Sequence, residues 1–136
     1  MGHRHQARII AFQGIFSREI NNLPAEQLLG FDWLDSDIKN PEIKQFASLL
    51  LAGTIENIDE IDKIINDNIE NWDFSRVSKV DLAILRISVY SLKYQQDIPS
   101  TVTIDEAINI AKEFGIDDSY RFINGVLDGI KKKLFS

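Results

Sequence analysis

The sequence predicts an all-α fold, a single compact domain over residues 1–136 with six or seven helices around one core. Apolar residues recur at intervals of three and four through most of the chain, which is the period of a helix with one buried face. No segment sustains the alternation of apolar and polar residues that marks a half-buried strand. With 136 residues, 44% of them hydrophobic, the chain can bury about two-thirds of its unfolded surface.

The first predicted helix covers residues 3–21, where apolar side chains form one stripe at helical spacing. The stripe consists of Ile9, Phe12, Ile15, Phe16 and Ile20. Pro24 suits the first position of a short second helix, because its fixed backbone angle is already helical, and Gly30 is expected to end that helix after Leu29. Residues 31–40, rich in Asp and Asn, are predicted to form a loop.

The next helix is predicted to begin at Asn40–Pro41, with the asparagine as N-cap and the proline at the first helical position. Helical spacing of apolar residues then continues from Phe46 nearly to Trp72. This pattern fits one long helix or two helices joined near Asn57. We expect one helix, bent at most around Gly53.

Residues 72–75 are predicted to connect this region to a helix that runs from about Val77 to Tyr94. Pro99 ends that part of the chain, because proline cannot continue a helix. The inner face of the helix is expected to carry Val80, Ile84, Ile87 and Tyr90 or Ser91.

Capping signals predict the last two helices. Thr103 and Glu106 have the spacing of a capping box, so we expect a helix that begins there and ends at Gly115. Either Asp117 or Asp118 can cap the final helix. Its predicted core face consists of Phe122, Ile123, Val126, Leu127 and Ile130.

The formal net charge of −6 is unevenly distributed. Residues 1–18 hold three arginines and no acid, residues 19–75 hold thirteen acids and three lysines, and residues 76–136 hold nine bases and eight acids. Local basic surface is therefore compatible with an acidic protein. Lys131–Lys133 place three charges on the last predicted turn, where the helix dipole favours them. That effect and contact with RNA explain these lysines about equally well.

The sequence gives little support to an enzyme. The absence of cysteine excludes disulfides and thiol nucleophiles, and no phosphate-binding glycine loop or Gly-x-Ser-x-Gly motif occurs. His3 and His5 point apart on a helix and make a poor metal pair. Paired acids such as Asp117 and Asp118 are better explained as caps or solvated faces. We therefore expect no catalytic residue, no metal site and no cofactor.

The expected location is the cytoplasm, without a membrane span. The longest apolar run, Leu49–Ala52, is far shorter than the roughly 20 residues that a spanning helix needs. The N-terminal segment lacks the apolar core of a signal peptide, because charged and polar residues recur through Glu19.

Arginines and aromatic residues suggest a nucleic-acid surface. Arg4 and Arg8 are neighbours on one helix face, where guanidiniums can clamp phosphates and stack on unpaired bases. Arg76, Lys79 and Arg86 form a second basic group. The aromatic residues that could stack on splayed bases are Phe16, Tyr90, Tyr94, Phe114, Tyr120 and Phe122. For each of them taken alone, burial in the core is the better explanation, and exposure is expected first for Phe114 and Tyr120.

A series of short motifs runs through nearly the whole chain. They are Arg4–Arg8, Ala11–Phe16, Phe46–Gly53, Trp72 with Arg76, Asp81–Arg86, Ile98–Pro99, Ile104–Ala107, Phe114–Gly115 and Phe122–Asp128. Each motif is weak alone. Together, in this order and at these intervals, they resemble the NusB family of transcription antitermination factors.

The resemblance implies an all-α fold of two packed helical halves. It also implies binding to single-stranded boxA-type RNA of ribosomal RNA leaders with the small-subunit ribosomal protein NusE, and assembly with RNA polymerase and other Nus factors. The implied RNA-binding residues are Arg4, Arg8, Phe16, Arg76, Arg86, Phe114, Asp118 and Phe122. Asp81 is expected near the edge that binds the protein partner. This hypothesis requires the implied RNA residues to share one solvent-facing strip.

Departures from the family pattern predict modest RNA affinity. His5 and Gln6 stand where the family usually has arginine or lysine, and Phe16 replaces a commoner tyrosine. Fewer charges release fewer counterions and give a shallower salt dependence. A basic partner would supply much of the missing positive charge, and the acidic residues 19–75 are candidates for recruiting it.

Two other functions fit the same fold. One is a helical protein-binding adaptor without RNA contact. The other is an RNA-targeting domain related to that of ribosomal RNA cytosine methyltransferases, which we consider less favoured because a chain ending at Ser136 leaves no room for a cofactor-binding domain. Self-association into a homodimer is left open by the sequence.

Overall fold

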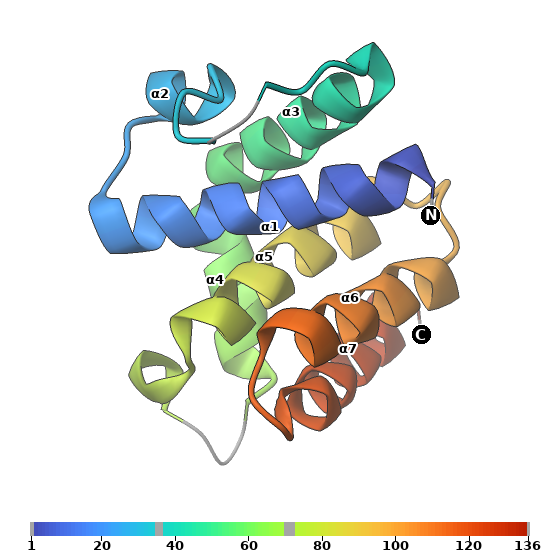
Figure 1. Cartoon of the computed structure of the whole chain (residues 1–136). Helices are drawn as coiled ribbons and strands as arrows, with labels where there is room; N and C mark the ends of the chain where they lie inside the picture. The colour runs from blue at the N-terminus through green and yellow to red at the C-terminus, as the bar shows by residue number, and fades with distance from the viewer. Residues whose placement is uncertain (1, 35–36, 70–72, 136) are drawn as a thin grey trace.

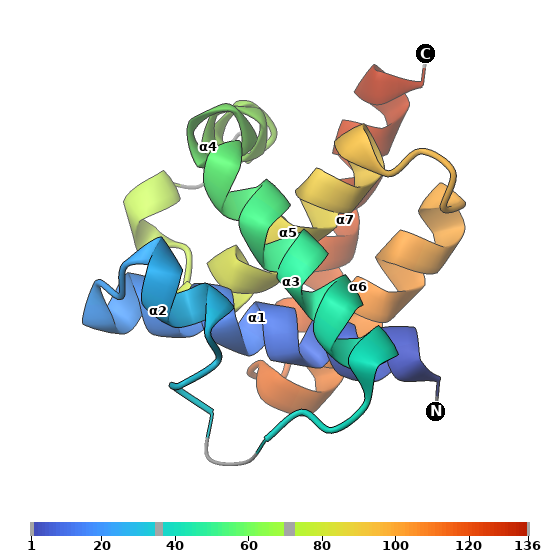
Figure 2. The same cartoon turned by 90° about the horizontal axis from the view of Figure 1, so that it is seen from above.

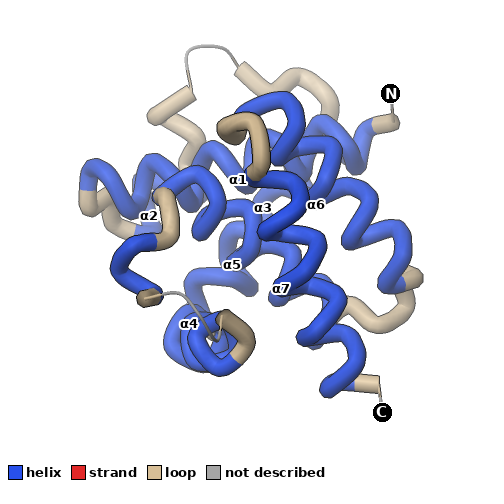
Figure 3. Tube along the Cα trace, turned by 90° about the horizontal axis from the view of Figure 1, so that it is seen from below, coloured by secondary structure: helices blue, strands red, loops and turns tan. Residues whose placement is uncertain are grey.

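The computed structural model describes residues 2–34, 37–69 and 73–135, and these residues form seven α-helices, one 3-10 helix and no strand (Figure 3). The predicted all-α class and the number of helices are confirmed. The elements are α1 (His3–Asn21), α2 (Ala25–Leu29), α3 (Pro41–Glu56), α4 (Ile58–Asp67), η1 (Phe74–Arg76), α5 (Lys79–Tyr94), α6 (Ser100–Phe114) and α7 (Ser119–Leu134).

Helix α5 lies at the centre of the molecule and contacts α1, α3, α4, α6 and α7 (Figure 1). Helix α3 packs against α1 and α2, α6 packs against α7, and α5 contacts both groups. Seen from above, α6 and α7 lie on the opposite side of the molecule from α2 (Figure 2). The two packed helical halves are therefore confirmed. Every residue of α5 from Asp81 to Leu92 is buried, so the single inner face predicted for this helix is too narrow. A central helix has apolar neighbours on all sides, which a one-sided stripe cannot reveal.

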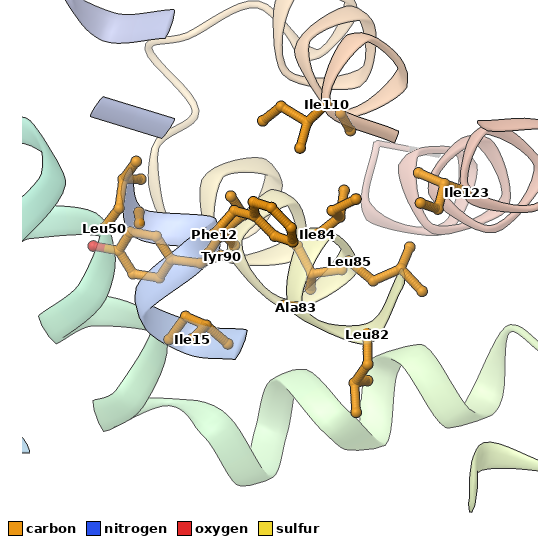
Figure 4. Packing of buried hydrophobic residues seen from close by; sticks show 14 of the residues in the cluster. Phe12, Ile15, Leu50, Leu82, Ala83, Ile84, Leu85, Tyr90, Ile110 and Ile123 are labelled. Carbon is orange, nitrogen blue, oxygen red and sulfur yellow. The ribbon is translucent and has the colours of Figure 1, made fainter. Parts of the chain in front are cut away.

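The core forms around α5, where side chains from both halves meet. Figure 4 shows Phe12 and Ile15 of α1 and Leu50 of α3 on one side of α5, with Ile110 of α6 and Ile123 of α7 on the other. Each of these side chains is at most 3% exposed. Complete burial of one such side chain contributes roughly 1.5–3 kcal/mol, so the halves are held together mainly by apolar contact.

The region predicted to form one long helix contains two, α3 and α4, so that prediction is wrong. The chain leaves helical geometry at Asn57, whose backbone has φ −113° and ψ 20°. The Asn57 side-chain Nδ2 donates to the carbonyl oxygen of Gly53 at 2.8 Å, and its backbone N–H donates to the same oxygen at 3.2 Å. Asparagine competes with the helical ladder in this way, which explains the break at Asn57. Gly53 lies within α3, where a Cβ would overlap the ring of Tyr90, so α3 and α5 cross closely there.

The helix starts vary in how well the sequence predicted them. Asn40 caps α3 as expected, and its Oδ1 accepts the backbone N–H of Glu42 at 2.8 Å. Pro24 precedes α2 as its N-cap and is not its first helical residue. The helix predicted from about Val77 begins at Lys79, after the cap Ser78.

The prediction that Thr103 and Glu106 form a capping box at the start of α6 is wrong. α6 begins at Ser100, directly after Pro99, and Thr103 is buried inside its first turn. The proline sets the start because it fixes the backbone just before the helix. Gly115 ends α6 as predicted, and Asp118 occupies the N-cap position of α7 without a side-chain capping bond. Trp72, part of the predicted connector and of the family motif, lies outside the described residues.

Candidate nucleic-acid interface

A cavity of about 230 Å³ lies where η1 and the start of α5 meet the connection between α6 and α7. It gathers four residues that the sequence marked for RNA or partner binding from segments far apart in the chain. These residues are Arg76, Asp81, Asp118 and Phe122. Val77, Ser78, Ile116 and Ser119 complete its lining.

Local hydrogen bonds fix the η1 side of the cavity. The side chain of Asp73 accepts the backbone N–H of Ser75 at 3.0 Å and so opens η1. The backbone N–H of Arg76 donates to the carbonyl oxygen of Asp73 at 2.8 Å, and the Arg76 side chain is exposed. The hydroxyl of Ser78 accepts the backbone N–H of Asp81 at 3.1 Å, which sets Asp81 on the first turn of α5.

Asp81 is the chemically distinctive group of this cavity. Its side chain is 8% exposed, and its Oδ1 atom has no hydrogen-bond partner among the described residues. Burial raises the pKa of Asp81, while hydrogen bonds with Ser119 and Ser78 offset part of that rise. An unpaired buried acceptor is costly. The site therefore favours a ligand that brings a cation or an N–H donor.

Two large apolar side chains, Ile116 and Phe122, line the cavity beside these polar groups. Ile116 is 80% exposed, the largest exposure among the exposed large hydrophobic side chains. Phe122 is partly buried and packs against the core. The backbone N–H of Ile116 donates to the Ser119 hydroxyl at 3.1 Å, so the connection between α6 and α7 holds a fixed form beside the cavity. Apolar rim residues around a buried polar group are typical of a binding surface.

The two N-terminal arginines differ in exposure. The guanidinium of exposed Arg4 lies 4.7 Å from the ring centroid of Phe46, and that of Arg8 lies 5.4 Å from the same ring. Arg8 is only 7% exposed and lies 3.8 Å from Glu106, which itself lies 2.7 Å from Nδ1 of His5. Burial lowers the pKa of Arg8, and the nearby Glu106 carboxylate counteracts that effect. The expected surface position of Arg8 is wrong, because Arg8 links α1 to α3 and α6.

Arg86 also lies in the interior. It is 5% exposed, and its Nε and Nη2 donate to the two carboxylate oxygens of Asp62, each at 2.8 Å. Its Nη1 donates to Glu19 at 3.0 Å, and Lys79 binds the same carboxylate at 3.2 Å. Burial alone would lower the pKa of Arg86, but the two carboxylates raise it overall. The expected place of Arg86 on a solvent-facing strip is therefore wrong, since its donors are used to join α1, α4 and α5.

The other two aromatic residues that the family resemblance implied, Phe16 and Phe114, are partly buried against the core. The expected exposure of Phe114 and Tyr120 is wrong, because both are partly buried, whereas Tyr94 is exposed. The ring of Phe114 lies 5.3 Å from that of Phe12. Because Glu106 lies beside His5 and Phe114 beside Phe12, α6 runs alongside α1 (Figure 1). Helix α6 therefore connects the Arg4 end of α1 with the cavity, while Arg8 and Arg86 are buried.

Sequence reasoning missed Glu106 and Phe46, the residues that hold the N-terminal arginines. Glu106 was assigned to a capping box and Phe46 to a core stripe. One signal could have identified the acid: no basic residue lies three or four positions from Glu106 on its own helix. A partly buried acid in that situation needs a partner from another element.

In the described ranges 2–34, 37–69 and 73–135, none of the helices combines the length and the hydrophobicity that a membrane span requires. No group of three or more His, Cys, Asp or Glu side chains there is arranged to hold a metal ion.

Comparisons with known proteins give a consistent result. The model of the NusB family matches residues 5–132. The chain is 51% identical to the transcription antitermination protein NusB of Treponema denticola, over 96% of each chain. It is 45% identical to that of Borreliella burgdorferi, over 97% of this chain and 96% of the relative.

Solved structures show the same fold. The structure of T. maritima NusB aligns with a TM-score of 0.86 and 38% identity, over 96% of this chain and 91% of that one. A structure of antitermination factors NusB and NusE in complex with double-stranded RNA aligns with a TM-score of 0.88 and 24% identity, over 98% of each chain.

Proposed function

The chain belongs to the NusB family of transcription antitermination proteins, and from this premise we propose that it binds single-stranded boxA-type RNA of ribosomal RNA leaders. It does so jointly with the small-subunit ribosomal protein NusE. The resulting complex joins RNA polymerase and other Nus factors and suppresses termination. The chain contributes binding and catalyses no reaction.

The cavity beside η1 is the observation that carries this proposal. Arg76 is exposed at its edge and can clamp a phosphate of the RNA. Phe122, with Phe114 at the end of α6, offers ring surface for unstacked bases. Asp118 can accept hydrogen bonds from base amino groups and repels misplaced phosphates, so it contributes selectivity.

Asp81 supports a role in partner binding. Its unpaired Oδ1 is an acceptor inside a mostly apolar site, which suits a basic side chain inserted by a protein. Exposed Ile116 at the rim would be covered by the same partner. RNA and partner would then meet at one cavity, with Arg76 and Asp118 on the RNA side and Asp81 on the protein side.

Burial of Arg8 and Arg86 reduces the positive charge available to RNA. Arg4 and Arg76 are the members of the predicted arginine set that remain exposed. We therefore expect weak RNA binding by the chain alone and a shallow dependence on salt. A basic partner raises the affinity by adding charge beside the acidic surface of this chain.

A binding titration tests the proposal. A short single-stranded boxA-type RNA and a scrambled RNA of equal length are titrated with the chain, with and without NusE, and followed by fluorescence anisotropy. We expect preference for the boxA-type RNA, and a large gain in affinity with NusE. Equal binding of both RNAs under both conditions would favour the adaptor function.

A variant locates the RNA contact. Arg76→Ala should weaken binding of the boxA-type RNA and reduce the slope of affinity against salt by about one phosphate contact, because one guanidinium is lost. Its melting temperature should stay unchanged, because the side chain is exposed. Lys44→Ala, which removes an exposed charge from α3, is the matched control.

A further inference from the structure

A second groove, of about 450 Å³, lies between α1 and the segment that leads into α3. Its apolar lining residues are Ile10, Leu34, Ile38 and Ile43, which we call its aliphatic floor. Its polar lining includes Gln6 and Gln13, which lie about two helical turns apart on one ridge of α1. This ridge differs from the one that carries His5, Arg8 and Phe12 toward α6.

The polar side chains of this groove are free to bind. Gln6, Gln13, Asp37 and Lys39 make no side-chain hydrogen bond or ion pair with any residue in the described part of the chain. Asn40, by contrast, uses its side chain to cap α3. Two free amides, one carboxylate and one ammonium group thus surround an aliphatic floor.

From this arrangement we propose that the groove binds one unpaired base of the RNA, an inference that rests on the proposed function. The amides of Gln6 and Gln13 can each donate and accept, which matches the edge of a base. The aliphatic floor takes the flat face of the base. The volume lies within the roughly 300–1,000 Å³ range of small-ligand sites.

Charge selects a base over a phosphate in this groove. Lys39 and Asp37 carry opposite charges, so the lining has no net positive charge to hold an anion. The Asp37 carboxylate repels phosphate oxygens but accepts hydrogen bonds from an exocyclic amino group. A base with such a group, adenine, cytosine or guanine, is therefore the preferred occupant.

The groove continues the surface along which the RNA is proposed to lie. Its residue Asn40 contacts His3, at 3.2 Å between Nδ2 and Nε2, and His3 adjoins exposed Arg4. At its other end Gln13 precedes Phe16 by one helical turn. RNA that follows α1 from Arg4 to Phe16 would pass the groove.

An abasic scan tests the assignment. The probe is a short single-stranded boxA-type RNA in which each nucleotide is replaced in turn by an abasic one, bound to the chain with NusE. The double variant Gln6→Ala/Gln13→Ala removes the two amides, and alanine retains the helix. The control is Gln27→Ala/Gln96→Ala, which likewise changes two glutamines, both exposed and outside the groove, without altering the net charge.

We expect the double variant to bind intact RNA about fivefold or more weakly, because it loses the hydrogen bonds of two amides to the base. It should show no further loss when one particular nucleotide is abasic, whereas the wild-type chain and the control lose affinity at that nucleotide. Penalties at all other positions should be the same in the three proteins.

Different results overturn different statements. Unchanged affinity and an unchanged abasic profile in the double variant would overturn the proposal that the groove binds a base. The proposed function would be unaffected. Weaker binding of NusE by the double variant in the absence of RNA would also overturn the groove, because the occupant would be a protein segment. Absence of RNA binding by the wild-type chain, even with NusE, would remove the proposed function and the groove together.

Discussion

Two buried charged residues of α5 lie five positions apart and are satisfied in opposite ways. Arg86 donates to three carboxylate oxygens, two from Asp62 and one from Glu19, and thereby joins three helices. Asp81 leaves its Oδ1 unpaired beside a cavity. The hydrogen bonds of Arg86 are made within the protein, whereas Asp81 keeps an acceptor that a ligand could use. Burial of a charge therefore does not by itself mark a binding site, and we propose one at Asp81 because its buried oxygen has no partner among the described residues.

The largest effect is expected for Arg86→Ala. The change leaves the Asp62 carboxylate without its cation and Glu19 with Lys79 alone, which should lower the free energy of unfolding by about 3–5 kcal/mol. Urea denaturation measures this loss, with exposed Arg76→Ala as the control. A loss below about 1 kcal/mol would mean that the Arg86 site is not the closed structural network of the comparison.

Arg8→Ala should have the next largest effect. It removes the cation between Phe46 and Glu106, so we expect a loss of roughly 1–3 kcal/mol in the free energy of unfolding. Exposed surface substitutions usually cost under about 0.5 kcal/mol. Thermal denaturation of Arg8→Ala and of Arg4→Ala distinguishes these values. Equal melting temperatures would mean that Arg8 contributes no more to stability than an exposed arginine.

The dependence of stability on pH tests the Arg86 network in a second way. Burial would raise the pKa of Glu19, but hydrogen bonds and charge from Arg86 and Lys79 lower it overall. A carboxyl whose folded pKa is lowered stabilises the fold above its ordinary pKa and loses that contribution as pH falls through the folded value. At neutral pH the free energy of unfolding of the wild type should therefore be roughly 1–2 kcal/mol higher than that of Glu19→Gln. The two stability curves should converge as pH falls below the folded pKa of Glu19, which lies under its ordinary value of 4.5, and a difference that persists at still lower pH would contradict the ion network.

The smallest effect on stability is expected for Asp81→Asn. Because burial raises the pKa of Asp81, its ionised form disfavours the fold, and wild type should gain stability as pH falls through the folded pKa. At neutral pH the variant should match wild type within about 1 kcal/mol. Its affinity for NusE should fall much more, measured by calorimetric titration. A large loss of stability with unchanged NusE binding would assign Asp81 to the fold.

Local signals explain which parts of the fold the sequence predicted. The helix of residues 3–21 and the cap at Asn40 follow from side chains within a few positions of one another. The break at Asn57 escaped prediction because the apolar spacing continues across it, and only the side-chain bond to Gly53 reveals it. The burial of α5 on all sides depends on neighbours that no local period reports.

The same distinction between local sequence signals and three-dimensional contacts applies to the candidate site. The motif resemblance selected Arg76, Asp118 and Phe122, and these do line one cavity. It could not distinguish exposed from buried arginines, because the acids that pair with Arg8 and Arg86 come from other helices. Whether a charge is satisfied is a property of three-dimensional contact, so the unpaired oxygen of Asp81 could be found only in the structure.

The crossing of α3 and α5 has a consequence for tracing distant ancestry. Gly53 has no room for a side chain, because a Cβ would overlap the ring of Tyr90. A chain that keeps this crossing must keep a glycine on one helix opposite a large ring on the other, or shrink the ring when the glycine changes. Correlated substitution at these two positions is therefore a steric fingerprint by which diverged sequences can be aligned in register, independently of any residue that binds RNA.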